Sequence, residues 1–384
     1  MKSLSLHNVG PISDANLTFG DLTVLVGPQA TGKSIALQFL KLLVDKGRVQ
    51  QQMKQYGIDW EGDRDAFLDA YFGEGMHSIW GPTSTIESDQ GRVEMDNLAR
   101  RSKPKTEESA FLVPAQRVLT LRNGWPRPFA DYSPGDPFAV RDFSEKLRVL
   151  VERELVGKAS LFPQKGRLKE ELRGLLAKHV FGNFGLKVHK LASQKRLVLS
   201  QSDAAAPLPY MVWSAGQREF VPLLLGLYWL IPPTKVSKRG KIDWVILEEI
   251  EMGLHPRAIS VVMLMVLELI GRGYRVCMST HSPQVLEAIW TIMHLREAKA
   301  APDALLEVFT APRTPGMLAL AEKSLSKDLK VHYFDRDSGR THDISSLDPD
   351  SSRIAEANWG GLAEFSSLAN KEVANAVARS RNVT

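Results

Sequence analysis

A glycine-rich octapeptide near the start of the chain has the residue types and spacing of a phosphate-binding loop. Residues 27–34 read Gly-Pro-Gln-Ala-Thr-Gly-Lys-Ser and match the pattern G-x-x-x-x-G-K-S/T. Glycines let main-chain N–H groups turn inward around phosphate oxygens, Lys33 can reach the β- and γ-phosphates, and the Ser34 hydroxyl can bind Mg²⁺. The predicted nucleotide-binding residues here are Gly27, Pro28, Gln29, Ala30, Thr31, Gly32, Lys33, Ser34 and Ile35.

Two adjacent carboxylates, Glu248 and Glu249, follow the apolar run Val245-Ile246-Leu247. Most Glu-Glu pairs are simply solvated, but a pair that follows a buried strand would be costly without a ligand. Successive residues of a strand face opposite ways. We therefore predict that Glu248 binds Mg²⁺ and that Glu249 polarises the attacking water of a hydrolysis reaction, with Lys33 also contributing to catalysis.

A histidine follows another short apolar run. His281 comes directly after Val276-Cys277-Met278-Ser279 and Thr280. A lone histidine is more often structural than functional, but this one is expected at the same edge of the sheet as the two motifs above. We predict that its imidazole bonds to the γ-phosphate.

The elements that would position these residues form a parallel α/β pattern. Leu22–Val26 reads as a buried strand, and helical spacing of apolar residues begins after it at Ser34. Two further strands, 244–247 and 276–279, flank a helical pattern at 258–270, which is the βαβ order of a parallel sheet. Ligands of such sheets bind at the carboxyl ends of the strands.

The rest of the chain suggests a head elaborated by insertions. We predict an N-terminal lobe over 1–117, with an inserted segment of helices and exposed loops at about 47–108. A lateral subdomain of helices and a β-hairpin (Leu186 to Leu199) follows over 118–212, and a C-terminal lobe over 213–384. The sequence has no sustained heptad pattern, so we expect no long coiled coil. Trp359 to Leu362 and the helix after them are expected to pack on the head.

Composition sets only broad limits. The formal net charge of +5 is compatible with nucleic-acid contact but too small to demonstrate it. Cys277 is the only cysteine, which excludes an internal disulfide and fits a reducing compartment. No apolar stretch reaches the ~18 residues of a membrane span. We expect a cytoplasmic protein without a membrane partner.

With these motifs in order along the chain, the sequence resembles the ABC-type ATPases. The likeness is to the branch that contains chromosome-maintenance and recombination ATPases, the overcoming-lysogenization-defect family and ATPase subunits of anti-phage defence. Residues 27–34 resemble Walker A, Gln116 the Q-loop glutamine, and 214–217 (Ser-Ala-Gly-Gln) the signature. Residues 245–249 resemble Walker B, 253–256 the D-loop, and His281 the switch histidine. Ala215 and Glu248 depart from the usual glycine and aspartate.

The resemblance implies how the site works. Two heads meet face to face, and ATP lies between Walker A of one head and the signature of the other. Ser214, Gly216 and Gln217 would then contact the nucleotide in trans, at the start of a helix whose free N–H groups favour an anion. Gln116 would join Ser34 and Glu248 around Mg²⁺. The two departures suggest slow hydrolysis.

Three functions stay open from the sequence. The first is a switch ATPase that senses a trigger and controls a separate effector, such as a nuclease or toxin, in anti-phage or abortive-infection defence. The second is a DNA-binding repair or recombination ATPase, in which the basic runs 100–105 and 235–241 contact phosphates. The third is the nucleotide-binding subunit of a transporter. Asp335 and Asp337 could form a metal-dependent nuclease site, although a β-hairpin turn explains the same residues better.

Overall fold

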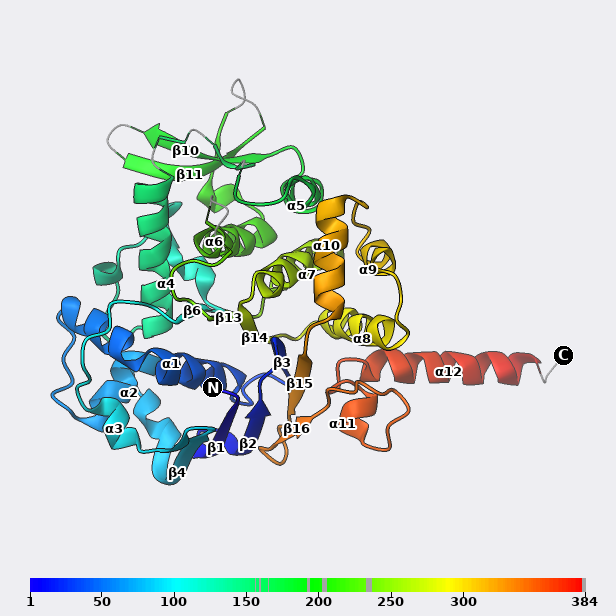
Figure 1. Ribbon diagram of the computed structural model, residues 1–384, viewed down its shortest axis with the longest axis horizontal. Helices are drawn as coiled ribbons and strands as arrows, with labels where there is room; N and C mark the ends of the chain where they lie inside the picture. The colour runs from blue at the N-terminus through cyan, green and yellow to red at the C-terminus, as the bar shows by residue number, and fades with distance from the viewer. Residues whose placement is uncertain are drawn as a thin grey trace.

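A six-stranded sheet forms the centre of the protein. The computed structural model describes residues 1–155, 157–158, 160–164, 166–191, 194–201, 206–232 and 237–381 (Figure 1). The strand order is β16-β15-β3-β14-β13-β6, and every neighbouring pair is parallel except β15 with β16. The strands are β3 (Leu22–Val26), β6 (Ala110–Val113), β13 (Trp244–Glu248), β14 (Arg275–Ser279), β15 (Leu329–Phe334) and β16 (Thr341–Asp343). The predicted strand-loop-helix and βαβ units are confirmed.

Both faces of this sheet are covered, as parallel sheets require. Along β13, Val245 and Leu247 belong to one hydrophobic cluster, and Trp244 and Ile246 belong to the other. The first cluster is completed mainly by helices from the second half of the chain. These are α6 (Ala215–Leu230), α7 (Pro256–Gly271), α8 (Pro283–Glu297), α9 (Pro302–Val308) and α10 (Pro315–Leu325).

The second face is covered by α1 (Lys33–Gln55) and an antiparallel sheet of order β2-β1-β4-β5. The strand β4 pairs with β1, so the segment predicted as an insertion of helices and loops supplies strands to the N-terminal sheet. Its Thr85 and Ile86 pair with His7 and Leu6. The elements of this lobe are β1 (Ser3–Val9), β2 (Ile12–Thr18), α2 (Arg64–Phe72), η1 (Met76–Ile79), β4 (Trp80–Ser88), β5 (Gly91–Val93) and α3 (Met95–Ala99).

The lateral part contains helices and its own small sheet, of order β12-β11-β10-β9 (Figure 1). The predicted hairpin is confirmed as β10 (Gly185–Leu191) and β11 (Gln194–Ser200). The other elements are η2 (Arg117–Thr120), β7 (Leu121–Arg122), β8 (Trp125–Pro126), η3 (Phe129–Asp131), α4 (Phe138–Val149), η4 (Leu150–Glu154), β9 (Ser160–Phe162), α5 (Glu170–Leu176), η5 (Ala177–Phe181), β12 (Leu208–Pro209) and η6 (Tyr210–Val212).

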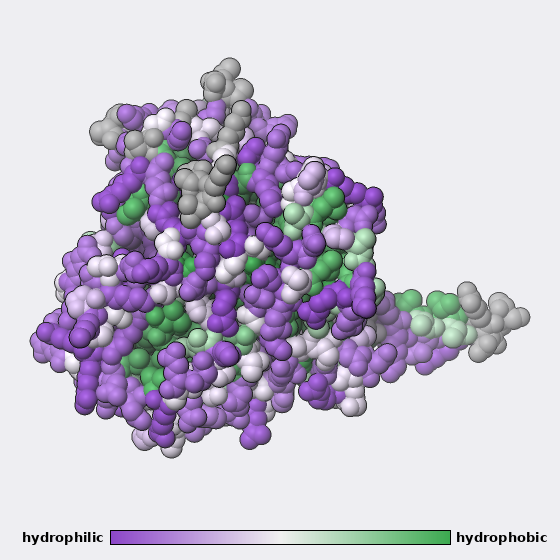
Figure 2. All heavy atoms as spheres, viewed as in Figure 1, coloured by the Kyte–Doolittle hydropathy of each residue, from purple (hydrophilic) through white to green (hydrophobic). Residues whose placement is uncertain are grey.

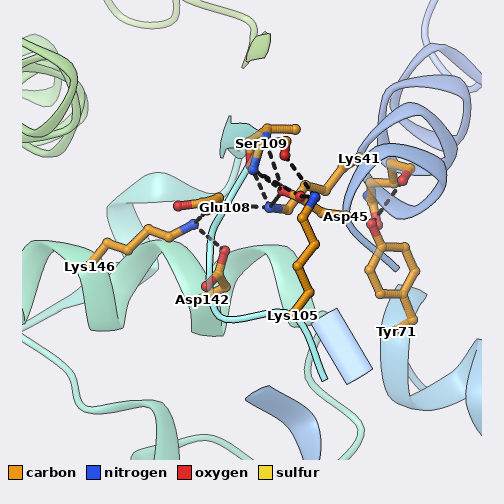
Figure 3. Close-up of polar contacts among 10 residues, drawn as sticks. Lys41, Asp45, Tyr71, Lys105, Glu108, Ser109, Asp142 and Lys146 are labelled. Carbon is orange, nitrogen blue, oxygen red and sulfur yellow. Dashed lines mark hydrogen bonds and ion pairs between the residues drawn. The ribbon is translucent and has the colours of Figure 1, made fainter. Parts of the chain in front are cut away.

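A buried ionic network joins α1, the loop before β6 and α4 (Figure 3). Asp45 has non-helical dihedral angles and kinks α1, and its carboxylate accepts hydrogen bonds from the main-chain N–H groups of Ser109 and Ala110. The Lys41 ammonium lies 2.9 Å from both Asp45 Oδ2 and Glu108 Oε1. The kink therefore attaches α1 to the edge of the central sheet at its amino end, opposite the end where parallel α/β sheets bind ligands.

The C-terminal segment differs from the prediction. Trp359 packs against the first hydrophobic cluster, with its ring centroid 6.3 Å from that of Trp290. After α11 (Ile354–Ala357), however, α12 (Glu364–Arg381) extends away from the head instead of packing on it (Figure 1). Phe365 is 83 % exposed and Val373 63 % exposed. The expectation that this helix packs on the head is wrong, because its apolar side chains, including Phe365, Leu368 and Val373, are turned to solvent.

Candidate functional site

Five strand ends meet at one edge of the central sheet. The parallel strands β15, β3, β14, β13 and β6 all point the same way, so the segments after their carboxyl ends lie side by side. The glycine loop follows β3, the two glutamates end β13, and His281 follows β14. This is the edge at which open α/β sheets bind ligands.

The glycine loop is held in a tight turn between β3 and α1. Ala30 has a φ of 61°, and Gly27 has a φ of 138°. A Cβ at Gly27 would lie 2.4 Å from the carbonyl oxygen of Phe334, so only glycine fits there. Arg336, just after β15, donates a hydrogen bond to the carbonyl oxygen of Gln29 at 2.5 Å. The C-terminal hairpin thus supports the loop from outside.

Lys33 bends back over the glycine loop. Its ammonium donates to the carbonyl oxygens of Gly27 at 2.8 Å and Pro28 at 2.6 Å. Burial lowers the pKa of Lys33 to about 8, while the charge of Glu249 acts in the opposite direction. At pH 7 the group is therefore mostly protonated and carries a positive charge into the loop.

Glu248 lies at the centre of the site and is 1 % exposed. Its Oε2 accepts hydrogen bonds from Ser34 Oγ at 3.3 Å and from the Ala115 N–H at 3.2 Å. Its Oε1 is buried and has no hydrogen-bond partner within the described residues. Burial raises the pKa of Glu248 to about 7, and the bonds from Ala115 and Ser34 oppose that rise. An anionic form of this carboxylate therefore needs a cation beside it.

Glu249 takes a different orientation from its neighbour. Its φ of 47° lies in the left-handed region, which is unusual for a residue with a side chain and recurs at functional sites. Its Oε1 lies 3.6 Å from His281 Nε2, and both side chains are 28 % exposed. The nearby His281 imidazole is the main cause that lowers the pKa of Glu249. The pair is accessible, whereas Glu248 is not.

Two residues that the sequence did not single out help to build the site. Arg117 is 1 % exposed, and its guanidinium donates to the main-chain oxygens of Glu248 and Glu249 at 2.9 Å each, and of Glu219 at 3.1 Å. Glu251 accepts a hydrogen bond from the His281 N–H at 2.5 Å. Their only signal in the sequence was proximity to predicted motifs, since nothing in composition shows that an arginine is buried.

These residues fit a magnesium–nucleotide ligand. A hydroxyl and a carboxylate, Ser34 and Glu248, form the hard oxygen donor set that Mg²⁺ prefers. The Glu248 Oε1 and Ser279 Oγ atoms are buried without hydrogen-bond partners among the described residues. These two oxygens are therefore available to bind a ligand at this edge of the sheet. Within the part of the chain that the structure describes, the Lys33 ammonium donates only to oxygens of its own loop, and phosphate oxygens would replace them.

The signature residues form the start of α6. Ser214 caps the helix: its Oγ accepts from the Gln217 N–H at 3.2 Å, and Gln217 Oε1 accepts from the Ser214 N–H at 3.0 Å. A Cβ at Gly216 would lie 2.6 Å from the carbonyl oxygen of Gly253, so the signature packs closely on the D-loop of the same chain. No hydrogen bond joins Ser214 or Gln217 to the glycine loop in the described part of the chain. Both remain near the surface.

Other predicted residues are placed less clearly. Gln116 is exposed, and within the described residues its neighbour Ala115, not Gln116 itself, contacts Glu248. Asp335 accepts hydrogen bonds from Ser338 and the Asp337 N–H, as in a hairpin turn. Among the described residues no group of three or more potential ligands could hold a metal. The nuclease interpretation therefore gains no support.

The basic runs predicted to contact DNA are largely engaged within the protein. Arg101 pairs with Asp59 at 2.9 Å, and Lys241 pairs with Glu107 at 2.8 Å. Lys105, Lys238 and Arg239 also contact carboxylates, those of Asp45, Asp243 and Glu154. Lys235 and Val236 lie outside the described residues. No described helix has the length and apolar character needed to cross a membrane.

The glycine loop, the carboxylates after β13 and the histidine after β14 define an α/β ATPase head of the ABC type. The chain belongs to the family described as "AAA domain, putative AbiEii toxin, Type IV TA system", whose model matches residues 22–287. No curated protein sequence matches the chain.

Several solved structures resemble the chain at low identity. An Smc head bound to the C-terminal winged-helix domain of ScpA is 13 % identical, with 74 % of this chain and 90 % of that chain covered and a TM-score of 0.40. A dimeric bacterial ABC transporter cassette is 12 % identical, with 88 % and 96 % covered and a TM-score of 0.35. The SMC head domain from Thermotoga maritima is 12 % identical, with 74 % and 90 % covered and a TM-score of 0.30.

Proposed function

We propose that this protein binds and hydrolyses ATP and uses the nucleotide as a switch between separate and paired heads. The observation that carries the proposal is the meeting of Lys33, Ser34, Glu248 and the Glu249–His281 pair at one edge of the sheet. In this proposal Ser34, Glu248 and Gln116 hold Mg²⁺, and the main-chain N–H groups of 27–35 hold the phosphates. Bound Mg²⁺–ATP supplies the phosphoanhydride bond and the charge that polarises it.

The residues of the chain have distinct roles. The accessible Glu249 carboxylate orients a water molecule and accepts its proton, while His281 fixes the carboxylate 3.6 Å away. Lys33 brings positive charge to the transferred group. Arg117 holds the main chain of both glutamates, so that the left-handed turn at Glu249 is kept in place.

The proposed site is completed by a second copy. Ser214 and Gln217 lie at the start of α6, whose first N–H groups favour an anion, and they do not contact the loop of their own chain in the described residues. A facing chain would bring this helix start to the γ-phosphate. The site then exists only when two heads are paired, and hydrolysis separates them.

The first test is turnover of the purified protein and of Glu249→Gln, with Glu322→Gln as a control for an exposed glutamate on α10. Glu249→Gln should lose at least ~100-fold in kcat, retain ATP and form dimers in ATP. The control should behave as the natural protein. Unchanged turnover in Glu249→Gln would show that another group activates the water.

We further propose that the switch controls a separate effector, such as a nuclease or toxin, in anti-phage defence, as in the ATPase subunits of such systems. The family description, which names a toxin of a toxin–antitoxin system, supports this setting. Tagged Glu249→Gln, expressed with its neighbouring genes and purified in ATP, should carry the effector with it. Mass spectrometry would identify that protein, and a permease in its place would favour the transporter function.

A further inference from the structure

One surface outside the nucleotide site carries a charge pattern that needs an explanation. Between 172 and 202 the chain has six Lys or Arg residues and no Asp or Glu. The formal net charge of the whole chain is +5, so the remainder is net negative. The positive surplus of the protein is thus concentrated in the segment that contains the hairpin of β10 and β11.

The outer half of this hairpin is a free two-stranded ribbon. The flanking strand β9 pairs with β10 only at Leu186 and Lys187, and β12 pairs with β11 only at Val198 and Leu199. Beyond these positions, among the described residues, the segment at Gly124 bonds to Leu197 of β11, and no strand pairs with the hairpin at Lys190, Lys195 or Arg196. In Figure 1 it lies in the upper part of the molecule.

Two like charges face each other across the ribbon, because the strand register places Lys190 opposite Lys195. Arg196 lies at the next position of β11, opposite His189. Like charges in directly opposite positions destabilise a strand pair. Within the described residues Lys190, Lys195 and Arg196 form no ion pair, and Arg196 Nε is buried without a hydrogen-bond partner. The folded chain therefore keeps an uncompensated cluster of cations here.

The arrangement of the cations suits phosphates on two sides. Successive positions along a strand face opposite ways, so Lys190 and Lys195 lie on one face and Arg196 on the other. A two-stranded ribbon has the width to enter the major groove of duplex DNA, where phosphates line both walls. No large apolar side chain of the hairpin itself is exposed among the described residues, although Met211, which is 72 % exposed, lines the cavity beside Lys195 and Arg196.

Further cations surround the base of the ribbon. A cavity of about 740 Å³ lies beside Lys195 and Arg196 and is also lined by Arg122, Arg127 and Trp125. Asp131 and Glu152 line it as well, but Asp131 pairs with both arginines and Glu152 pairs with Arg148. Figure 2 shows hydrophilic side chains interspersed with some hydrophobic ones over the coloured atoms of this upper part of the molecule.

From these observations we propose that the β10–β11 ribbon is a binding surface for duplex DNA, held through its phosphates and without sequence preference. This goes beyond the proposed ATPase function, because binding at the ribbon does not depend on nucleotide turnover. The ribbon is also connected to the nucleotide site: the Leu197 N–H donates to the carbonyl oxygen of Gly124 at 2.8 Å, in the segment that follows Arg117. If the proposed function holds, DNA should change ATP turnover.

The test is fluorescence anisotropy with a labelled 30-base-pair duplex over a range of salt concentrations. The Lys190→Glu/Lys195→Glu variant should lose at least ~10-fold in affinity, and the slope of log K against log salt should fall by about 2. The matched control is Arg100→Glu/Lys103→Glu, which changes the net charge by the same amount in the basic run 100–105, away from the ribbon. It should bind as the natural protein does.

A second variant separates binding from folding. Lys195→Glu alone would create an ion pair across the strands with Lys190, so it should raise Tm by about 1–2 °C while it weakens DNA binding. Equal affinity of the natural protein and both ribbon variants would overturn the proposal. So would binding only to the single strand, or to poly-glutamate in preference to the duplex, which would indicate an acidic protein partner. If the natural protein binds the duplex but does not hydrolyse ATP under any condition, the proposed ATPase function is overturned and the DNA-binding proposal stands.

Discussion

The guanidinium of Arg117 donates a hydrogen bond from Nη2 to the main-chain carbonyl oxygen of Glu249 at 2.9 Å. A second bond, from Nη1, reaches the carbonyl oxygen of Glu248. A third reaches Glu219 on α6, the helix that begins with the signature. One buried side chain thus connects the carboxylates of the site with the element that a second head would contact.

Replacement of Arg117 by lysine should uncouple these parts. Lysine keeps the charge but cannot reach three carbonyl oxygens in the fixed geometry of a guanidinium. We expect kcat to fall by about tenfold or more, with little change in ATP affinity, because the glycine loop is untouched. Steady-state kinetics measure the fall in kcat, and a nucleotide-binding assay measures the ATP affinity. An equal loss in kcat and in affinity would show that Arg117 serves the fold in general and does not position Glu249.

Mixed chains should reveal whether the site is shared. Lys33→Ala removes the phosphate contact of one chain, and Ser214→Arg blocks the start of α6, so each variant alone should be inactive. An equal mixture should recover about a quarter of the natural activity, because half of the dimers would hold one intact composite site. ATP turnover of the mixture measures this directly. No recovery, under conditions where mixed dimers form, would contradict a site built from two copies.

Removal of one side chain of the ionic network in Figure 3 should lower the stability of the protein but leave its nucleotide binding unchanged. Lys41→Met removes the buried cation between Asp45 and Glu108, which keep only Lys105 and Lys146 as charged partners, so the free energy of unfolding should fall by about 3 kcal/mol. Lys54→Met, at an exposed position of the same helix, is the control and should change it by less than ~1 kcal/mol, because it loses only the contact of the ammonium with the Trp60 ring. Urea denaturation measures both. ATP affinity of the folded fraction should stay unchanged.

The same network predicts acid sensitivity. Burial acts to raise the pKa of Asp45, but the Lys41 charge and the main-chain bonds from Ala110 and Ser109 outweigh it and lower the pKa. A carboxyl whose pKa is lower in the folded state stabilises the protein above its unfolded pKa of ~3.9, and that stability is lost as the pH falls through the folded value. The free energy of unfolding should thus decline below about pH 4. Asp45→Asn should be less stable at pH 7 and less sensitive to acid.

The sequence predicted the parts of the site that local pattern controls. The glycine loop after β3 and the glutamates after β13 could be placed because short apolar runs mark buried strands, and the strands of a parallel sheet end at the same edge. Contacts between distant segments could not be found this way. The buried Arg117 and the support of Gln29 by Arg336 depend on tertiary packing that no spacing encodes.

The segment at 47–108 shows the same limit. Its strand β4 is rich in Gly, Pro, Ser and Thr, so it has no clean alternation of apolar residues. It becomes a strand because β1 offers an edge to pair with. For α12 the expected helix is present, but a helical sequence pattern alone does not show whether the helix packs on a surface of its own chain.

That solvent-facing helix offers a means of observation. An isolated helix of 18 residues is only marginally stable in water, so its amide hydrogens should exchange with deuterium much faster than those of the buried α7. A protein that comes to lie along Phe365 and Leu368 would slow the exchange. Deuterium uptake at 364–381 would therefore report the arrival of a partner, independently of any measurement at the nucleotide site.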